Sequence, residues 1–368
     1  MARYLGQAFG HKVVVLRAGD NTRYKRLLAS VAPMSDQVDG YASAPLFILS
    51  HIALLWKLPG LIFRLRRLRP DLVIVNMPGL EFGWLYLYAS KLLRIPVLCW
   101  LHNPYRYAEL SQAWGWRRRV NIVRDSLANR FVNLLYEDLY TVSEASRAHL
   151  LARLGRDEGV GLLRNVVEDQ ESNSAAAVDL RSLPGCTVPA SYTLAVVPGR
   201  IEFGHKGQDR IASALPRFET EGIAVFFVGD GPDAARLEQL CAGAGNAFFL
   251  GWQDQLASYI AAADVVLIPS RFDSQGLVLV EAIHAGIPAV VSSIPAFSQV
   301  LDARFQADFD DAADVVGAVR RVKLLTKIQL RQAYERALHE SGASGYAEHV
   351  ASVLSRAISP AGDPKPPT

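Results

Sequence analysis

The sequence has little cysteine. Cys99, Cys186 and Cys241 are the three cysteines among 368 residues, and neither a CxxC pair nor a Cys/His cluster accompanies them. An odd number of widely separated cysteines excludes a disulfide scaffold, and their spacing excludes the usual zinc sites. We therefore expect a protein of a reducing, cytoplasmic environment.

A long uninterrupted apolar run is also lacking. The nearest approach is 44–63, which Lys57 and Pro59 interrupt, whereas a membrane-spanning helix needs about 20 consecutive apolar residues. The first residues lack the charged and then apolar build of a signal peptide. Leucines recur instead at three- and four-residue steps from Leu54 to Leu68, which predicts an amphipathic helix divided near the proline.

Low-complexity segments are few, and a composition of 50% hydrophobic and 20% charged residues excludes a disordered or fibrous chain. The net charge of +3 conceals an asymmetry. Residues 1–170 contain 23 Lys and Arg against 14 Asp and Glu, whereas the remainder contains 16 against 22. Length and charge together predict two domains, of which the first faces an anionic partner.

Short apolar runs alternate with helical segments along the chain. They lie at 11–16, 71–77, 95–102 and 139–143, and again at 192–199, 223–232, 247–251, 264–270 and 287–293. Runs that are apolar on both faces and separated by helices are typical of parallel sheets covered on both sides. The polar stretch 168–186 is the best candidate for a linker. We therefore predict two Rossmann-like α/β domains, at 1–170 and 171–345, followed by a helix and a disordered tail at 346–368.

A glycine-rich turn at 229–234 (GDGPDA) follows one of these apolar runs and has the form GxGxxA. In a dinucleotide-binding domain, such glycines let a pyrophosphate approach a helix N-terminus, and Asp254 would be a candidate for the ribose. The alternative is a tight strand-to-helix turn in which Asp230 caps the helix and Pro232 lies in its first turn. Both interpretations stay open, because short glycine motifs often occur by chance.

A second pattern in the same domain suits a diphosphate. Gly199 and Arg200 follow the apolar run that begins at 192, and Lys206 comes shortly after them. Two cations on one loop could neutralise a diphosphate from one side. Each cation alone would more often be a solvated loop charge, so the argument depends on their order within one domain.

The opposite side of such a site would come from the turn at 274–276 and the helix expected at 277–284. Backbone amides at a helix N-terminus, together with its positive dipole end, favour an anion. Asp273 and Glu281 lie eight positions apart, a little over two helical turns. Carboxylates accept hydrogen bonds from sugar hydroxyls, although Asp273 could instead be a helix cap.

These residues resemble a known family. The stretch 199–293 is similar to the nucleotide-sugar-dependent glycosyltransferases of family 4, a retaining family with the two-domain GT-B fold. Arg200 and Lys206 match the family's Gly-Arg and Lys-Gly pair, Glu281 matches its second acid, and 286–288 matches the Gly-x-Pro turn after it. In the first domain the resemblance is carried by WLHNP around His102, TVSEAS around Ser143 and RNVVED around Asn165.

The resemblance implies transfer of a sugar from a nucleoside diphosphate sugar with retention of the anomeric configuration. The donor would be UDP- or GDP-linked, and neither a metal nor another cofactor would take part. Arg200 and Lys206 would stabilise the leaving diphosphate, which is electrostatic catalysis aimed where charge develops. The amides of Gly276 and Leu277 would assist them, and Gly199 would form part of the donor site.

The remaining implied roles concern the sugars. Glu281 would hold the ribose hydroxyls, and Asp273 would orient the donor sugar. His102 would reach the donor sugar from the first domain, across the cleft between the two domains of a GT-B fold. A lone histidine after a strand is otherwise as often a structural residue.

The sequence departs from the family pattern at several positions. Asp273 stands where the family usually has Glu, which is one methylene longer. The loop after it reads SQG where the family has GFG, and Val166 stands where the family usually has Gly. The shorter acid could change the donor preference.

The first domain departs further, because family members begin with a strand and a glycine-rich loop that this chain does not contain before its Gly10-His11 segment. The absent strand would be central in a doubly wound sheet. Its loss would leave unpaired backbone groups and an unfilled core. We therefore expect that the natural protein begins upstream of Met1, or that the chain is a truncated product.

A literal DxD motif, Asp308-Phe309-Asp310, resembles the metal-binding motif of other glycosyltransferases. It leads into a helix-like segment, so acids at a helix N-terminus are the interpretation that we adopt. The prediction assigns no metal site.

The acceptor site is expected in the first domain, which also has two basic clusters. Arg64, Arg66, Arg67 and Arg69 follow the apolar helix, and 114–119 (WGWRRR) adds two tryptophans and three arginines. Tryptophan beside arginine suits the interface of an anionic membrane, although basic runs alone are usually solvated. No nucleic-acid-binding motif accompanies them, so no nucleic-acid partner is expected. We predict a peripheral enzyme at the inner face of the cell membrane that acts on a lipid-linked sugar.

Two other functions stay open. A nicotinamide-dependent oxidoreductase would depend on the 229–234 turn alone. A catalytically degenerate GT-B scaffold would be consistent with the absent first strand.

Overall fold

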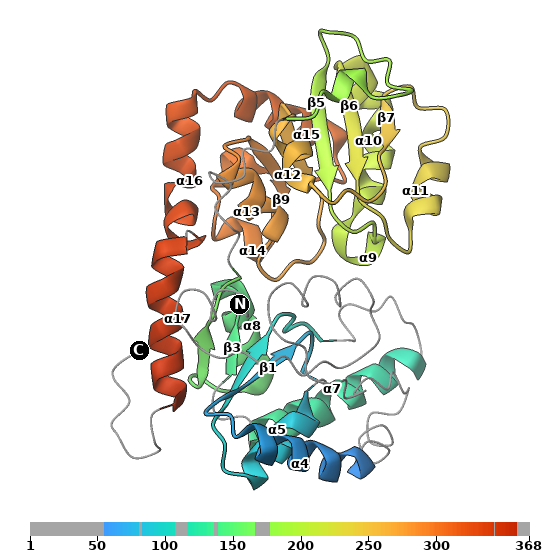
Figure 1. The fold of residues 1–368 in the computed structure, drawn as a ribbon. Coiled ribbons are helices and arrows are strands. Elements are labelled where there is room, and N and C mark those ends of the chain that lie inside the picture. Colours follow the sequence, from blue (N-terminus) through green and yellow to red (C-terminus); the bar gives the residue numbers. More distant parts are fainter. Residues whose placement is uncertain are drawn as a thin grey trace. The chain divides into compact units, whose positions relative to one another are not determined.

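The computed structural model describes residues 55–80, 83–106, 116–135, 139–165, 177–341 and 343–358. The chain divides into a first unit, residues 1–165 with 347–368, and a second unit, residues 166–346. Each unit contains one parallel sheet with helices around it (Figure 1). The predicted fold class, α/β with two parallel-sheet domains, is confirmed.

The sheet of the second unit has six strands in the order β7-β6-β5-β8-β9-β10, all parallel. They are β5 (Thr193–Pro198), β6 (Ile223–Val228), β7 (Ala247–Phe249), β8 (Val265–Ile268), β9 (Ala289–Ser292) and β10 (Gln306–Ala307). Every residue of β6, β8 and β9 is buried, as expected for strands covered by helices on both faces. The strand order reverses between β5 and β8, which makes that position the topological switch point where open α/β sheets bind ligands.

Helices lie between these strands and after the last of them. They are α9 (Phe203–Lys206), α10 (Gln208–Thr220), α11 (Ala234–Leu240), α12 (Leu256–Ala261), α13 (Leu277–His284), α14 (Pro295–Ser298), α15 (Ala312–Lys323) and α16 (Lys327–Ser341), with short 3-10 turns η3 (Leu180–Ser182) and η4 (Ala303–Phe305). The helix predicted at 277–284 is confirmed at both ends by α13. Tyr334 holds α16 against the start of β9, because its hydroxyl donates to the carbonyl oxygen of Ile287 and accepts the backbone N–H of Ala289.

The described part of the first unit has four parallel strands in the order β1-β2-β3-β4. They are β1 (Val73–Met77), β2 (Val97–Leu101), β3 (Leu139–Thr141) and β4 (Val160–Leu162). The helical elements of this unit are η1 (Leu55–Lys57), α4 (Leu58–Leu68), α5 (Trp84–Leu92), α7 (Trp116–Leu135) and α8 (Glu144–Leu154). The helix α17 (Ala343–Ile358) crosses the boundary between the units, and its residues from 347 onward belong to the first unit.

The predicted amphipathic helix is present in its described part. Leu61 and Leu65 are buried, Pro59 lies in the first turn of α4, and the short turn η1 precedes it. The predicted linker 168–186 is too long at its C-terminal end, since Leu180 is fully buried in the core of the second unit. The apolar run at 11–16 and the absent first strand lie outside the described residues.

Candidate functional site

Two loops meet at the switch point of the second sheet. The first follows β5 and contains Gly199 and Arg200, and the second follows β8 and leads through Asp273 to α13. A Cβ added to Gly199 would lie 3.8 Å from Cγ2 of Val278, so this glycine lies against the first turn of α13. The topology therefore brings together the two loops that the sequence analysis selected.

Lys206 reaches the second loop from the end of α9. Its Nζ donates to Oδ2 of Asp273 at 2.6 Å. The Lys206 side chain is 31% exposed and that of Asp273 only 12% exposed. The ion pair places a cation beside the turn that opens α13, and this is where a phosphate would meet both the charge and the helix N-terminus.

Asp273 also organises that turn. Its Oδ1 accepts the backbone N–H of Gly276 at 2.7 Å and that of Gln275 at 3.3 Å. Gly276 has a φ of +76°, and a Cβ there would lie 2.5 Å from the ring of buried Phe297. The helix-capping alternative for Asp273 is wrong, because Gly276 is itself the N-cap of α13 and has no side-chain cap. Asp273 instead accepts amides of the turn before the helix, and the Gly276 amide donates to this carboxylate.

Glu281 lies on α13 and is largely buried. Burial raises the pKa of this carboxyl to about 7, and the positive charge of Lys206 opposes that rise. Its Oε2 atom has no hydrogen-bond partner within the described ranges. A buried acceptor without a partner is costly, so a ligand hydroxyl at this atom would be favoured.

Arg200 is the exposed member of the group. Its side chain is 64% exposed, and Nε lies 3.5 Å from Oε2 of Glu202. The other oxygen of Glu202 lies 2.9 Å from Nδ1 of His205. The same loop therefore offers one cation to the solvent and ties a second basic side chain to a carboxylate.

His102, the predicted site residue of the first unit, directly follows β2. Its backbone N–H donates to the carbonyl oxygen of Met77 at the end of β1 (2.9 Å), and its ring lies 4.5 Å from that of Trp100. Burial lowers the pKa of His102 to about 4, so the imidazole is neutral near pH 7. Its Nε2 is buried and has no hydrogen-bond partner in the part of the chain that the structure describes. This places a neutral imidazole, with Nε2 unpartnered among the described residues, at the carboxyl edge of the first sheet.

The DxD motif is engaged by an arginine. Arg210 of α10 donates through Nε to Oδ1 of Asp310 at 2.8 Å and through Nη2 to Oδ1 of Asp308 at 3.1 Å. Asp311, the next acid, caps α15 by accepting the backbone N–H of Ala313. The two carboxylates of the motif therefore form ion pairs with a guanidinium in front of a helix.

The glycine-rich turn after β6 contacts protein backbone. A Cβ on Gly229 would lie 1.9 Å from the carbonyl oxygen of Gly199, and one on Gly231 would lie 2.1 Å from that of Ile201. The close approach for which these glycines are needed is thus made by the loop after β5, which disfavours the dinucleotide interpretation. The capping prediction for this turn is wrong, because the residue at the N-cap of α11 is Asp233 and Asp230 accepts the N–H of Gly231.

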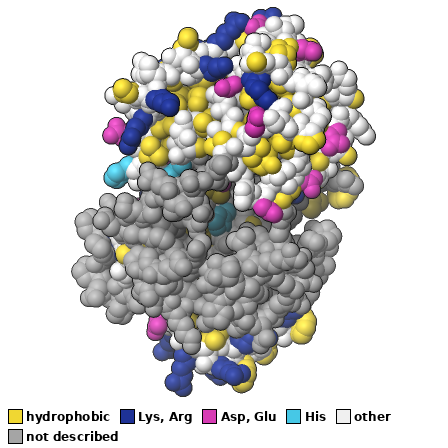
Figure 2. Space-filling model, turned by 45° about the horizontal axis from the view of Figure 1, so that its top comes forward, with side chains coloured by type: hydrophobic (Ala, Val, Ile, Leu, Met, Phe, Trp, Pro, Cys, Tyr) yellow, Lys and Arg dark blue, Asp and Glu magenta, His cyan; other side chains and the backbone are white. Residues whose placement is uncertain are grey.

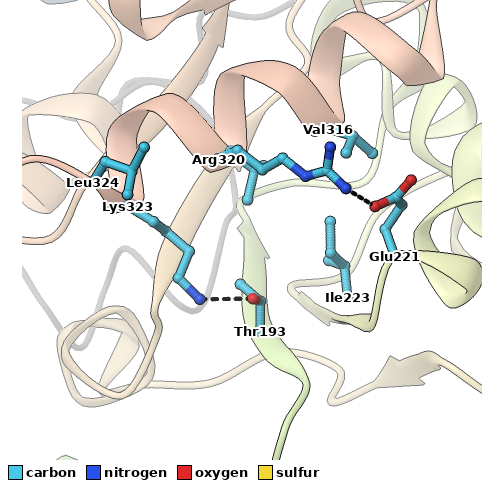
Figure 3. A pocket seen from close by; sticks show the side chains of 8 residues that line it. Thr193, Glu221, Ile223, Val316, Arg320, Lys323 and Leu324 are labelled. Atoms are coloured by element: carbon cyan, nitrogen blue, oxygen red, sulfur yellow. Dashed lines mark hydrogen bonds and ion pairs between the residues drawn. The ribbon is translucent and has the colours of Figure 1, made fainter.

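A pocket of about 370 Å³ opens at the opposite, amino edge of the second sheet (Figure 3). Thr193 and Ile223, the first residues of β5 and β6, form its floor with side chains of α15. Lys323 donates to the Thr193 hydroxyl at 2.7 Å, and Arg320 is paired with Glu221. Its polar groups bind one another, and open α/β sheets bind ligands at the other edge. We therefore place no functional site in this pocket.

Models of known families match residues in both units. The model of Glycosyltransferase Family 4 matches residues 1–171, and that of the Glycosyl transferases group 1 matches residues 193–323. The chain belongs to the group 1 glycosyltransferases of family 4.

Curated relatives of this family have moderate similarity. The sulfoquinovosyl transferase SQD2 of Arabidopsis thaliana is 27% identical over 240 residues, which are 64% of this chain and 45% of the relative. The phosphatidyl-myo-inositol mannosyltransferase of Mycolicibacterium smegmatis is 35% identical over 144 residues, which are 37% of each chain. The match therefore spans about half of the length of the first relative and about a third of the second.

Solved structures share the fold over nearly the whole chain. Alr3699/HepE of Anabaena, crystallised with UDP and glucose, aligns with a TM-score of 0.72 at 17% identity and covers 95% of this chain and 94% of its own. WaaG, a glycosyltransferase involved in lipopolysaccharide biosynthesis, aligns with a TM-score of 0.63 at 19% identity and covers 96% and 94%. The fold is therefore the GT-B fold that the resemblance implies.

Several residues around the site were not found from the sequence. Gln208, only 2% exposed, donates to the carbonyl oxygen of Arg200 at 2.9 Å. Arg271 donates to the carbonyl oxygen of Phe203 at 2.8 Å while Asp209 holds its guanidinium. A polar side chain that binds backbone of another segment leaves no pattern in the sequence, because every residue offers the same carbonyl group and local spacing does not identify the partner.

Proposed function

We propose that this chain is a retaining glycosyltransferase that moves a sugar from a nucleoside diphosphate sugar to a glycan acceptor, without a metal ion. The observation that carries the proposal is the ion pair of Lys206 at the N-terminus of α13, next to the loop with Arg200. Cations, a helix N-terminus and an unpartnered acidic side chain at the switch point suit a nucleotide whose phosphates and ribose lie side by side. The complex of Anabaena Alr3699/HepE with UDP and glucose supports this ligand class.

In this reaction the bond between the anomeric carbon and the oxygen of the β-phosphate breaks. The acceptor hydroxyl oxygen forms the new bond to that carbon, and its proton leaves with the diphosphate. Arg200 and Lys206 would stabilise the negative charge that develops on the leaving group, which is the largest electrostatic demand of the step. Glu281 would accept the ribose hydroxyls, and His102 would contact the donor sugar as a neutral hydrogen-bonding group.

Thermal unfolding of the full chain with UDP, GDP, ADP and NAD tests the donor site. A ligand present at about a hundred times its dissociation constant stabilises the folded state by about 2.7 kcal/mol. We expect a shift of the transition with UDP or GDP that Arg200→Ala and Glu281→Ala abolish. Arg304→Ala is the matched control, because Arg304 is also an exposed, ion-paired arginine of the second unit.

The other outcomes favour the alternatives. A shift with NAD alone would favour the oxidoreductase, and a cooperative transition that no nucleotide moves would favour the degenerate scaffold. Turnover with the donor that binds then tests the reaction itself. Lys206→Ala should lower it by about a hundredfold or more, which is the usual cost of removing one electrostatic stabiliser.

We propose further that the acceptor is lipid-linked and that the first unit binds an anionic membrane surface. Trp56 lies just before α4 and is 75% exposed, and Phe63 on α4 is 68% exposed. Trp116 at the start of α7 is 70% exposed. Arg66 and Arg67 lie in the last turn of α4. At the lower edge of Figure 2, basic and hydrophobic side chains lie beside each other. Aromatic groups with arginines are suited to the headgroup region of a bilayer.

None of the described helices has the length and apolarity needed to cross a bilayer. Sedimentation with vesicles of anionic or neutral lipid tests binding at the surface. Replacement of the three arginines at 117–119, or of Trp56 and Phe63 by serine, should abolish binding that is sensitive to salt. Leu324→Ser with Ile328→Ser is the control, because these exposed residues belong to the second unit. Binding unchanged in the first-unit variants would contradict the membrane proposal.

A further inference from the structure

The turn 229–233 lies outside the proposed donor site, yet its sequence is adapted to one neighbour. Side chains on Gly229 and Gly231 would overlap the carbonyl oxygens of Gly199 and Ile201. Both Cβ–O distances, 1.9 and 2.1 Å, are shorter than real Cβ contacts. A residue other than glycine at either position would displace the segment that contains Arg200.

Backbone hydrogen bonds follow the same contact. The N–H of Gly199 donates to the carbonyl oxygen of Val228 at 2.9 Å, and the N–H of Ile201 donates to that of Asp230 at 3.1 Å. In return, the N–H of Asp233 donates to the carbonyl oxygen of Ile201 at 3.3 Å. The last residue of β6 therefore binds the backbone before Arg200, and the turn itself offers one acceptor and one donor to the backbone after it.

Asp233 continues this pattern with its side chain. It occupies the N-cap of α11, where an aspartate ordinarily accepts an amide of its own helix. It makes no such bond. Its Oδ2 accepts the backbone N–H of Phe203 at 2.8 Å instead. Phe203 is the first residue of α9, and Lys206 is the last.

We propose that the turn 229–233 is a positioning element for Arg200 and Lys206, and that Asp233 is its positioning residue. The inference depends on the proposed function, since it concerns the two cations that would bind the diphosphate. The glycines admit the segment 199–201, the backbone sets its register, and the Asp233 carboxylate fixes the start of α9. Charged groups held in place in advance bind a ligand without a further ordering cost. Loss of the carboxylate therefore weakens the binding of a diphosphate that it does not touch.

The test uses Asp233→Ala in the full chain, with two measurements. Hydrogen–deuterium exchange reports the order of 199–206, and calorimetry gives the dissociation constants of UDP, GDP and ADP. We expect faster exchange in 199–206 and a dissociation constant about tenfold higher for the nucleotide that the wild type binds. Asp233→Asn keeps an acceptor oxygen for Phe203 and should restore both values.

Asp311→Ala is the matched control. Asp311 is also an aspartate at a helix N-cap, but its carboxylate caps its own helix, α15. This variant should lose stability and keep both the exchange of 199–206 and the nucleotide affinity. Unchanged exchange in Asp233→Ala would overturn the proposal, as would faster exchange with unchanged affinity, or an equal loss of affinity in Asp311→Ala. If the wild type binds none of the three nucleotides, the proposed function fails, and the exchange of 199–206 still decides whether Asp233 holds the segment.

Discussion

Lys206 and Asp273 form an ion pair between the two loops of the candidate site, with Nζ 2.6 Å from Oδ2. The same carboxylate accepts the Gly276 amide through Oδ1. A phosphate that approaches Lys206 must therefore compete with Asp273 for its ammonium group. The acid is both part of the turn that opens α13 and a competitor of the ligand.

Asp273→Asn should consequently bind a nucleoside diphosphate more tightly. The amide keeps an acceptor for Gly276 and the length of the side chain, but it removes the charge that holds Lys206. For a partly exposed ion pair, we expect a gain of about three- to tenfold in affinity, measured by calorimetry with UDP and GDP. Asp302→Asn is the control, since it weakens an ion pair with Arg304 that is 2.7 Å long, close to the 2.6 Å between Lys206 and Asp273. Weaker binding in Asp273→Asn would mean that the carboxylate itself holds the ligand.

Glu281 makes stability depend on pH. Between pH 4.5 and about 7 the folded protein keeps a proton on this carboxyl that the unfolded chain has lost, so stability falls as the pH rises through this window. Across this window the free energy of unfolding falls by about 3 kcal/mol in total. Glu281→Gln, which is neutral at every pH, should match the wild type at pH 4.5 and exceed its stability at pH 8. Chemical denaturation at both values tests this, with Glu238→Gln on exposed α11 as the control. Parallel profiles for Glu281→Gln and the wild type would contradict it.

Gly276 should tolerate a side chain less well than Gly286 does. Both have positive φ values, +76° and +66°, so alanine costs about 1 kcal/mol of backbone strain at either position. At Gly276 the new Cβ would also meet the buried Phe297 ring at 2.5 Å, whereas at Gly286 it would meet open space. We expect Gly276→Ala to cost at least about 1 kcal/mol more in denaturation experiments. Equal losses would show that the ring can move aside.

Much of the second unit could be predicted from the sequence because its signals are local. β6 and β8 are runs of buried aliphatic and aromatic residues, and the glycine turn before α13 marks where that helix begins. The sequence does not indicate β10, which has only two residues, or β4, whose apolar run is interrupted by Gly161, whereas the equally short β3 and β7 lie in longer apolar runs. Pairing with a neighbouring strand defines such short segments, and that pairing leaves no periodicity in their own residues.

The site was predictable in its residue types and less so in its contacts. Arg200, Lys206 and Glu281 could be selected by order and spacing, but the binding of both Lys206 and the Gly276 amide by the Asp273 carboxylate is a product of the fold. The turn 229–233 shows the same limit. Its glycines indicate a close approach, and only the structure identifies the loop after β5 as the partner.

In the first unit, a buried arginine orders the loop that follows His102. Arg153 of α8 donates to the carbonyl oxygens of Pro104 (2.7 Å) and Tyr105 (3.0 Å), and its guanidinium lies 3.6 Å from the buried Asp125 carboxylate. The two side chains are 2% and 8% exposed. Unpaired charge is costly at such depth, so each group depends on the other.

Arg153→Met should therefore destabilise the first unit by about 3 kcal/mol or more, because it strips the guanidinium from Asp125 and from two carbonyl oxygens. Denaturant unfolding measures the loss, and the double variant with Asp125→Asn should recover part of it, since no buried negative charge then remains. Arg147→Met on the same helix is the control. It also removes a hydrogen bond to backbone, to the carbonyl oxygen of Val160 (2.7 Å), but its partner Glu144 is 3.9 Å away and exposed, so no buried charge is left behind. Additive losses in the Arg153 and Asp125 variants would show that the two charges do not depend on each other.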